Sequence, residues 1–398
     1  MPEVWVQVER RDVTLWLRRT GTGMLGNDVD ISRNPCPCIM AGGLGGGNTS
    51  QYWIEDDGMK AVAATQDKPP YRVPSMAEIN AIPPNGFKVA STFSGCGGSS
   101  LGYRMAGFKV VWANEFVPAA QDSYRANMAE GCFLDRRDIH AVKPEEILEQ
   151  TGLAKGELDL FDGSPPCQAF SMAGKREKGW GEKKKYEHGA AQCNETLFDE
   201  YTRLLRGLMP KTFVAENVSG LVKGTAKGYF LEILAALKAS GYRVKCKVLD
   251  AQWLGVPQIR QRTIFVGVRD DIDLDPVHPL PLPYRYSVRD ALPEILRVDI
   301  NKDFDRQVAN MDSSASPYMT VGASPSSGNG RAGKIETKTE KRKFTIAELK
   351  RICAFPDDFI LTGTYAQQWE RLGRSVPPVM MRAIAGAIRD GVLAHAPR

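Results

Sequence analysis

The chain of 398 residues contains no long apolar run. No stretch approaches the roughly 18–20 unbroken apolar residues that a membrane-spanning helix needs. The first residues, MPEVWVQVERRD, also lack the apolar centre of a secretory signal peptide. These absences argue against membrane insertion and export, so we expect a cytoplasmic protein.

Cysteine is scarce and scattered. The eight cysteines are spread over the whole chain, a distribution typical of reduced thiols rather than of a disulfide framework. Only Cys36 and Cys38 are close together, and one intervening residue is too few for the usual zinc-binding spacing. We therefore expect neither a disulfide framework nor a metal site.

The two common phosphate-binding motifs are missing as well. There is no loop ending in Gly-Lys-Ser or Gly-Lys-Thr, and the glycines of FSGCGGSS (93–100) do not match the dinucleotide fingerprint. FSGCGGSS nevertheless follows the apolar run KVASTF, and a glycine-rich turn between strand and helix lets a cofactor approach the main chain. The next apolar run ends in Glu115, about 20 residues on, where a carboxylate can hold ribose hydroxyls. The run after it ends at Asp138 and Ile139, in a position to meet an adenine ring. Together these features favour a single nucleoside-like cofactor.

The overall composition is that of a globular protein. Hydrophobic residues make up 42% and charged residues 25% of the chain, and the length suffices for one full domain with smaller appendages. The net charge of +5 permits an anionic partner. Six Lys or Arg and three Glu fall in GKREKGWGEKKKYEH (174–188), which predicts a basic loop.

Short apolar runs alternate with helical stretches from Phe87 to about Asp270. The runs are KVASTF, KVVWANE, LDLFD, TFVAENV and TIFVGV, and YFLEILAALKAS is one of the helical stretches. This alternation predicts an α/β fold with a doubly wound, mostly parallel sheet that helices cover on both faces. Before it, VWVQV and VTLWL alternate strictly and predict two half-buried strands.

The regular pattern stops at about Asp270 and resumes in FTIAELKRICAF and PPVMMRAIAGAIRDGV, which predict helices. Residues 312–333 are rich in Ser, Gly and Pro and predict an exposed loop. PCPCIMAGG (35–43) and SPYMTVGAS (316–324) share a proline, then a methionine, then Ala or Gly. Either they are duplicated pieces of one binding module or the likeness is a chance match.

Cys167 stands in GSPPCQAFS, directly after the run LDLFD. This places the thiol in a loop beyond the carboxyl end of a strand, where open α/β sheets bind their ligands, and the prolines restrict the backbone there. A thiolate is a strong nucleophile that nearby positive charge favours. The alternative is an inert structural cysteine in a turn.

Two further motifs end or begin predicted strands. Glu216 and Asn217 end the run TFVA, and a carboxyl in an enclosed pocket can donate a proton; alternatively Glu216 is an ordinary acidic residue at a helix N-terminus. QIRQR (258–262) places Arg260 and Arg262 on one strand face, where they could clamp a phosphate or a base edge. The alternative for the arginines is a solvated edge.

These motifs occur in the order and rough spacing of a known family. FSGCGGSSLGYRMAGF, NE, RDI, GSPPCQAFS, ENV, QIRQR, FTIAELKRICAFPDDF and GRSVPP resemble the motifs of cytosine-C5 DNA methyltransferases. The resemblance covers about 87–268 and 343–386. It implies a Rossmann-like methyltransferase fold and transfer of a methyl group from S-adenosylmethionine to C5 of a flipped-out cytosine in double-stranded DNA.

The resemblance assigns roles to individual residues. Cys167 resembles the nucleophile that adds to C6, Glu216 the acid that engages N3 and the exocyclic amine, and Arg262 the residue that holds O2, with Arg260 in support. The residues that resemble cofactor contacts are Phe93, Gly95, Gly98, Glu115, Asp138, Ile139, Pro166, Ser375 and Val376. The basic loop, 174–192, would fold over the DNA.

The resemblance also divides the chain into parts. We expect an N-terminal extension at 1–86 that supplements DNA recognition, and a catalytic and cofactor-binding domain at 87–268. A small target-recognition region at 269–343 and C-terminal helices at 344–398 would follow. The protein is expected to be a monomer, and a restriction endonuclease of the same system is a candidate partner.

Two departures leave alternatives open. Arg374 stands where the family usually has Asn after the glycine of its last motif, and the recognition region is short. A degenerate homologue that binds DNA without methylating it is therefore one alternative. A transfer-RNA cytosine methyltransferase is another, although the Cys-Phe-Thr tripeptide associated with that subfamily is absent.

Overall fold

The structure is a computed structural model of the chain. It describes residues 68–128, 131–165, 197–222, 227–295, 297–299, 316–324, 334–337, 339 and 341–397, and the backbone of 5–10, 13–18, 184–185 and 191–192. Internal contacts divide the chain into two compact units, Met1–Asp67 and Lys68–Arg398. The first unit contains an antiparallel hairpin of β1 (Trp5–Arg10) and β2 (Val13–Arg18), which confirms the two strands predicted from strict alternation.

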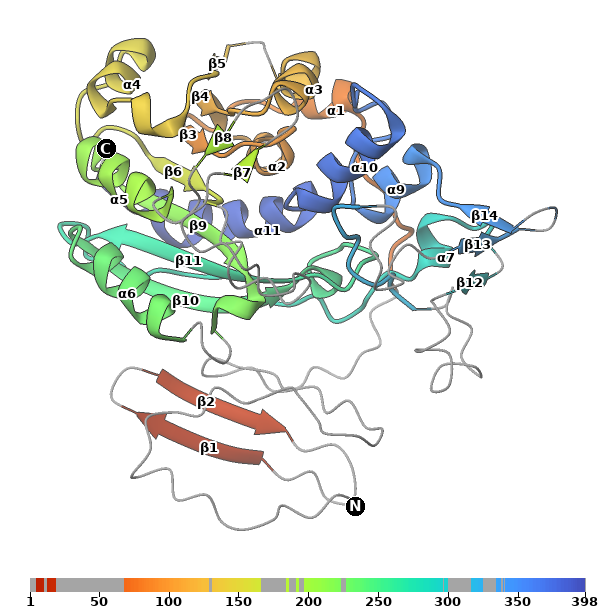
Figure 1. Ribbon diagram of the computed structural model, residues 1–398. Helices are drawn as coiled ribbons and strands as arrows, with labels where there is room; N and C mark the ends of the chain where they lie inside the picture. The colour runs from red at the N-terminus through yellow and green to blue at the C-terminus, as the bar shows by residue number, and fades with distance from the viewer. Residues whose placement is uncertain are drawn as a thin grey trace. The chain divides into compact units, whose positions relative to one another are not determined.

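The second unit is built on a seven-stranded sheet with the order β10-β11-β9-β6-β3-β4-β5 (Figure 1). Its strands, in chain order, are β3 (Lys88–Thr92), β4 (Lys109–Asn114), β5 (Phe133–Asp135), β6 (Leu160–Gly163), β9 (Thr212–Val218), β10 (Tyr242–Asp250) and β11 (Gln261–Arg269). Neighbours from β9 to β5 run parallel, and only β11 runs antiparallel to its neighbours. The predicted mostly parallel sheet is confirmed.

Helices cover both faces of this sheet because the strand residues alternate between two apolar cores. Leu160 and Val214 face the core of α2 (Gly98–Met105), α3 (Pro118–Met128) and α11 (Pro378–Ile388). Phe161 and Phe213, their immediate neighbours in sequence, face the core of α4 (Pro144–Thr151), α5 (Leu197–Leu208) and α6 (Lys227–Lys238). Burial on both faces explains the nearly continuous apolar runs of the parallel strands, and the doubly wound arrangement is confirmed (Figure 1).

The C-terminal helices return to the sheet as predicted. After α9 (Ile346–Ile352) and α10 (Tyr365–Arg374), α11 begins at Pro378 and packs along α2. Proline suits the first turn of α11 because its missing N–H would have no partner inside the helix. Next to these helices lies the three-stranded sheet β12 (Arg297–Asp299), β13 (Lys334–Glu336) and β14 (Lys341–Lys343), with α7 (Val288–Ala291) before it in sequence.

Residues 316–324 are not the exposed loop that their composition predicts. Tyr318 and Val321 are buried, and Tyr318 forms a parallel bridge with Gln258. The indole N–H of Trp369 donates to the carbonyl oxygen of Gly322 at 2.9 Å. The predicted exposed loop is wrong here because small residues such as Gly322 allow the segment to pass close to α10 and to Gln258, just before β11. Its proposed echo at 35–43 lies outside the described residues.

Residues 68–86, which the sequence analysis grouped with the N-terminal extension, pack on the second unit. Tyr71 donates its hydroxyl hydrogen to the carbonyl oxygen of Arg351 at 2.7 Å, and Ile79 of α1 (Met76–Asn80) is buried in the α2 core. Among the described residues, no helix combines the length and the apolar character that crossing a bilayer requires.

Candidate active site

The glycine-rich turn after β3 lies against the last sequence motif. A Cβ added to Gly98, the first residue of α2, would lie 2.5 Å from the carbonyl oxygen of Val376 and 3.1 Å from Cβ of Ser375. Ser375 Oγ lies 3.2 Å from Cys96 Sγ and donates to the carbonyl oxygen of Arg371 at 2.6 Å. The structure therefore brings Gly98, near the start of the second unit, together with Ser375 and Val376, near its end.

Glu115, directly after β4, contacts the same glycine-rich turn. Its Oε2 accepts from the main-chain N–H of Gly95 at 2.7 Å, and its Oε1 accepts from that of Val117 at 2.6 Å. Burial raises the pKa of the Glu115 carboxyl, while these two hydrogen bonds and the charge of Arg371 act in the opposite direction. The carboxylate is thus held at the carboxyl ends of two adjacent strands.

The turn leaves room for a ligand. Gly95 has a φ of +58°, in the left-handed region that favours glycine, and a Cβ there would have nothing within 4 Å. The preceding Phe93 also has a positive φ, of 53°, and is half-buried against the α5 core. Open space beside a glycine main chain and a buried carboxylate suits the sugar and main-chain contacts of a nucleoside-like cofactor.

Asp138 and Ile139 follow β5 at the neighbouring strand end. Asp138 caps a short helix by accepting from the main-chain N–H of His140 at 3.1 Å, and its Oδ1 lies 2.6 Å from His140 Nδ1. Ile139 is buried in the α5 core. Among the predicted cofactor contacts, Pro166 lies outside the described residues, as does Cys167.

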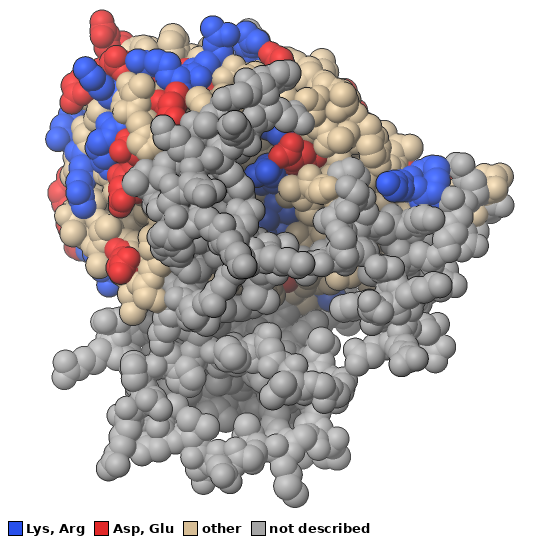
Figure 2. Space-filling view, viewed as in Figure 1, with Lys and Arg blue, Asp and Glu red and all other residues tan. Residues whose placement is uncertain are grey.

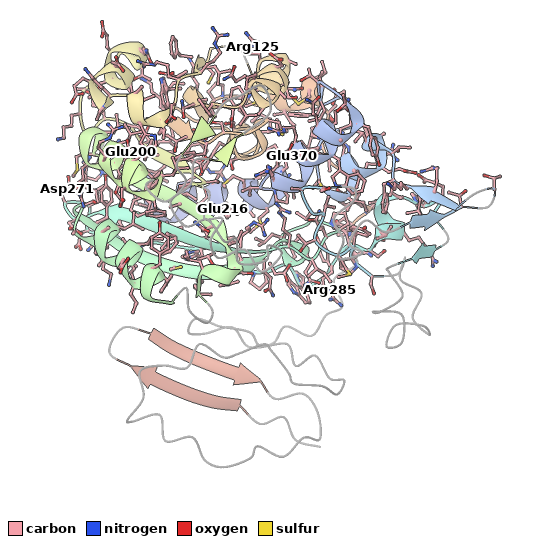
Figure 3. All side chains as sticks on the ribbon, viewed as in Figure 1. Arg125, Glu200, Glu216, Asp271, Arg285 and Glu370 are labelled. Carbon is pink, nitrogen blue, oxygen red and sulfur yellow. The ribbon has the colours of Figure 1, made fainter. Side chains whose placement is uncertain are left out.

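Glu216 and Arg262 form an ion pair on adjacent antiparallel strands. Arg262 Nε lies 2.7 Å from Glu216 Oε1, and the two side chains are 14% and 11% exposed. Glu216 belongs to β9 and Arg262 to β11, whose register pairs Glu216 with Ile264. Because both groups are nearly buried, this pair holds the carboxylate in one orientation instead of forming a mobile surface contact. Figure 3 labels Glu216 near the end of its strand.

The Glu216 motif also contacts the start of the Cys167 loop. Asn217 Nδ2 donates to the carbonyl oxygen of Pro165 at 3.3 Å. Pro165 is the last described residue before the loop. The carboxyl ends of β6 and β9 therefore bring Pro165 next to the Glu216 motif. Figure 2 shows basic and acidic side chains together near the centre of the view.

Arg260 stands just before β11, outside the strand on which it was predicted, and is only 1% exposed. Its Nη1 donates to the carbonyl oxygen of Val321 at 3.3 Å and its Nη2 to that of Gly373 at 2.9 Å. Burial and the charge of Arg262 lower the pKa of Arg260 to about 9, which still leaves it charged at neutral pH. Its guanidinium connects the segment before β11 to Val321 and to Gly373. Arg260 is therefore neither a solvated side chain at a strand edge nor placed to clamp a phosphate.

Two features of the site escaped the reading of the sequence. Asp162 of β6 is buried, accepts from Ser91 Oγ at 2.7 Å and from the Tyr103 hydroxyl at 2.9 Å, and burial raises its pKa to about 7. Arg371 of α10 is also buried. The apolar surroundings of Asp162 were visible in LFDG, but nothing near Arg371 in sequence indicates that it faces the glycine-rich turn.

Comparison with known proteins identifies the family of the chain. Residues 87–302 and 286–390 match the family model of the C-5 cytosine-specific DNA methylases. The type II methyltransferase M1.HphI of Haemophilus parahaemolyticus is 30% identical over 328 residues, which cover 74% of this chain and 85% of the relative. M.NgoFVII of Neisseria gonorrhoeae is 30% identical over 344 residues, covering 76% and 86%.

A solved structure shares the fold. It is that of a proposed DNA modification methyltransferase encoded within an E. coli prophage, and it superposes with a TM-score of 0.56 at 21% identity, covering 77% of this chain and 99% of the other. The glycine-rich turn, the buried Glu115 and the Glu216–Arg262 pair thus stand where the sequence motifs of one family meet. The chain belongs to the C-5 cytosine-specific DNA methylases and is a DNA (cytosine-5-)-methyltransferase that uses S-adenosylmethionine.

Proposed function

We propose that the enzyme methylates cytosine in double-stranded DNA through a bond between the Cys167 sulfur and C6 of a base rotated out of the duplex. The observation that carries the proposal is the buried Glu216–Arg262 pair beside the start of the Cys167 loop. A nucleophile alone would leave negative charge on the pyrimidine, and an acid held next to it offsets that charge.

The roles of the residues follow from the chemistry of the base. Rotating a base out of the stack costs a few kcal/mol and exposes C6. The Cys167 thiolate forms a bond to C6, while Glu216 holds a proton at N3 and Arg262 donates to O2. The electron pair then available at C5 takes the methyl group that S-adenosylmethionine supplies. Loss of the C5 proton to water, departure of the sulfur as a thiolate and return of the N3 proton to Glu216 restore the aromatic base, and S-adenosylhomocysteine is left as the other product.

The proposed cofactor site combines the glycine-rich turn with the motif that covers it. Gly95 and Gly98 would allow close approach to the main chain, and Glu115 would hold ribose hydroxyls. Phe93, Asp138, Ile139 and Pro166 would surround the adenine, and Ser375 and Val376 would close the pocket from the C-terminal side. The contact of Val376 with Gly98 supports this arrangement.

The test is replacement of the sulfur by a hydroxyl. Cys167→Ser should abolish incorporation of labelled methyl groups into duplex DNA and retain binding of S-adenosylhomocysteine. Cys246→Ser, at a half-buried thiol of β10, serves as the matched control and should keep full activity. Wild-type protein should form a denaturation-resistant adduct with 5-fluorocytosine DNA. Full activity of Cys167→Ser, or label appearing in transfer RNA and not in DNA, would contradict the proposal.

The partners are also proposals. We infer that the protein acts as a monomer, that a restriction endonuclease recognises the same sequence, and that residues 269–343 choose the target with help from the N-terminal unit. Mapping 5-methylcytosine in cells that express the full chain, or the chain without residues 1–67, tests the last point. An unchanged target sequence after the deletion would rule out a role for that unit.

A further inference from the structure

A buried guanidinium stands behind the residues that cover the cofactor site. Arg371 lies on α10, four residues before Ser375, and is 7% exposed. Its Nη2 donates to Glu370 Oε2 at 2.9 Å, but its Nε is buried and has no hydrogen-bond partner among the described residues. Burying a charged donor without a partner is costly. Among the described residues no acceptor meets this N–H, so it is available to a ligand.

The surroundings of Arg371 point to the glycine-rich turn. The Ser375 hydroxyl donates to its carbonyl oxygen, and the Cys96 sulfur lies against the same Ser375 hydroxyl. The positive charge of Arg371 lowers the pKa of two groups of that turn, Glu115 and Cys96, against the larger effect of their burial. The guanidinium is thus near enough to the proposed cofactor pocket to act on its charges.

Arg374, the residue that departs from the family pattern, belongs to the same cluster. Its Nε donates to Glu370 Oε1 at 2.7 Å, and its side chain is 47% exposed. Glu370 therefore receives one guanidinium on each carboxylate oxygen (labelled on α10 in Figure 3). Arg374 bonds to Oε1 of Glu370 from the exposed side. Arg371, which bonds to Oε2, is therefore the buried cation of this cluster.

The cofactor offers one group that matches this cation. Its adenosine end is uncharged, and its methionine end carries an α-carboxylate beside an α-ammonium group. Of these groups only the carboxylate is an anion, and a planar guanidinium binds a carboxylate through two parallel N–H donors. We propose that Arg371 binds the α-carboxylate of S-adenosylmethionine, with Glu370 holding the guanidinium in place. This inference rests on the proposed cofactor site and adds a residue that binds the methionine end of the cofactor.

The experiment compares two ligands that differ in one group. S-adenosylhomocysteine has the α-carboxylate, and its decarboxylated analogue lacks only that group. Calorimetric titration of the full chain should show that Arg371→Met binds S-adenosylhomocysteine roughly 10- to 100-fold more weakly than wild type, as expected for loss of a charge-assisted hydrogen bond. Both proteins should bind the decarboxylated analogue with the same affinity.

Two further variants keep the test decisive. Arg371→Lys retains the charge without the planar fork, so it should lose less affinity for S-adenosylhomocysteine and none for the analogue; it replaces Arg371→Met should that variant fail to fold. Arg374→Met, the exposed guanidinium on the same carboxylate, is the matched control and should not discriminate between the ligands.

The opposite results are equally clear. Equal losses for both ligands, or selective loss in Arg374→Met instead, would overturn this inference alone, because the cofactor site would still bind. Wild-type protein that binds neither ligand would overturn the proposed cofactor site and this inference with it.

Discussion

Arg260 and Gly373 are joined by a hydrogen bond of 2.9 Å from Nη2 to the main-chain carbonyl oxygen, across 113 residues of sequence. Arg260 stands two residues before Arg262, which pairs with Glu216, and Gly373 stands two residues before Ser375, which covers the glycine-rich turn. A single buried side chain therefore connects the proposed base-binding pair to the cover of the cofactor site.

Replacing Arg260 with Met should affect both sites at once. The change leaves the carbonyl oxygens of Val321 and Gly373 without their donor, so we expect the free energy of unfolding to fall by about 1–3 kcal/mol. Affinity for S-adenosylhomocysteine and the rate of methyl transfer should fall together. Denaturant unfolding and calorimetry measure these quantities. Arg206→Met, at an exposed arginine of α5 that donates to Ser240 Oγ, is the control, and equal effects of the two variants would contradict the prediction.

Replacing Glu216 with Gln should slow the chemistry without weakening cofactor binding. The amide cannot transfer a proton to N3 and forms no ion pair with Arg262, so we expect the methyl transfer rate to fall roughly 100- to 1,000-fold. Single-turnover assays with excess enzyme measure this step directly. Glu149→Gln, at an exposed position of α4, provides the comparison; a loss of less than tenfold would remove Glu216 from its proposed role.

The buried carboxyl of Asp162 makes stability depend on pH. Burial raises its pKa to about 7 from the ordinary value of 3.8. Between these pH values the unfolded chain has released this proton and the folded chain retains it, so this group destabilises the fold increasingly as pH rises toward 7.

Asp162→Asn removes that titration and keeps a hydrogen-bonding group between Ser91 and Tyr103. The stability of the variant relative to wild type should therefore increase between pH 4 and 7.5, by on the order of 4 kcal/mol at most. Denaturant unfolding at several pH values measures the difference. Asp199→Asn on the surface of α5 should show a flat difference, and a flat difference for Asp162→Asn would show that this carboxyl ionises normally.

Two glycines of the packed helix pair α2 and α11 should respond oppositely to alanine. At Gly98 the new methyl group would lie 2.5 Å from the carbonyl oxygen of Val376, so the variant should lose about 1–3 kcal/mol of stability and bind S-adenosylhomocysteine more weakly. At Gly386, inside α11, it would have nothing within 4 Å, and the variant should gain roughly 0.5–1 kcal/mol. Thermal unfolding distinguishes the two, and a stabilising Gly98→Ala would show that this contact is not tight.

The reading of the sequence was most successful where a local pattern decides the structure. Parallel strands buried on both faces must be nearly continuous apolar runs, so β3, β4, β6 and β9 could be found without tertiary information. β10 was missed because it is an edge strand: Arg243, Lys245 and Lys247 interrupt its apolar residues, and Lys245 pairs with Asp275 beyond the sheet.

Contacts between distant segments could not be read in this way. Tyr318 is buried where it bridges to Gln258, 60 residues earlier, and Arg371 is buried near Cys96, 275 residues earlier. Residues 312–333 are rich in Ser, Gly and Pro, which predicted an exposed loop, but only the fold determines that Tyr318 and Val321 within them are buried. The motifs around Glu216 and Arg262 were recognised as separate pieces, and their distance of 2.7 Å required the antiparallel register of β9 and β11.

The bridge between Gln258 and Tyr318 has a consequence for how such enzymes diversify. The polypeptide leaves the large sheet after β11 and comes back to the entrance of that same strand, while Leu282 donates to the carbonyl oxygen of Trp253 nearby. Both ends of the segment between β11 and Tyr318 are therefore hydrogen-bonded to the part of the chain around β11. On the proposed role of this segment in choosing the target, an insertion, deletion or exchange within it would alter which bases are contacted and leave the seven-stranded sheet intact, so target specificity could change independently of methyl transfer.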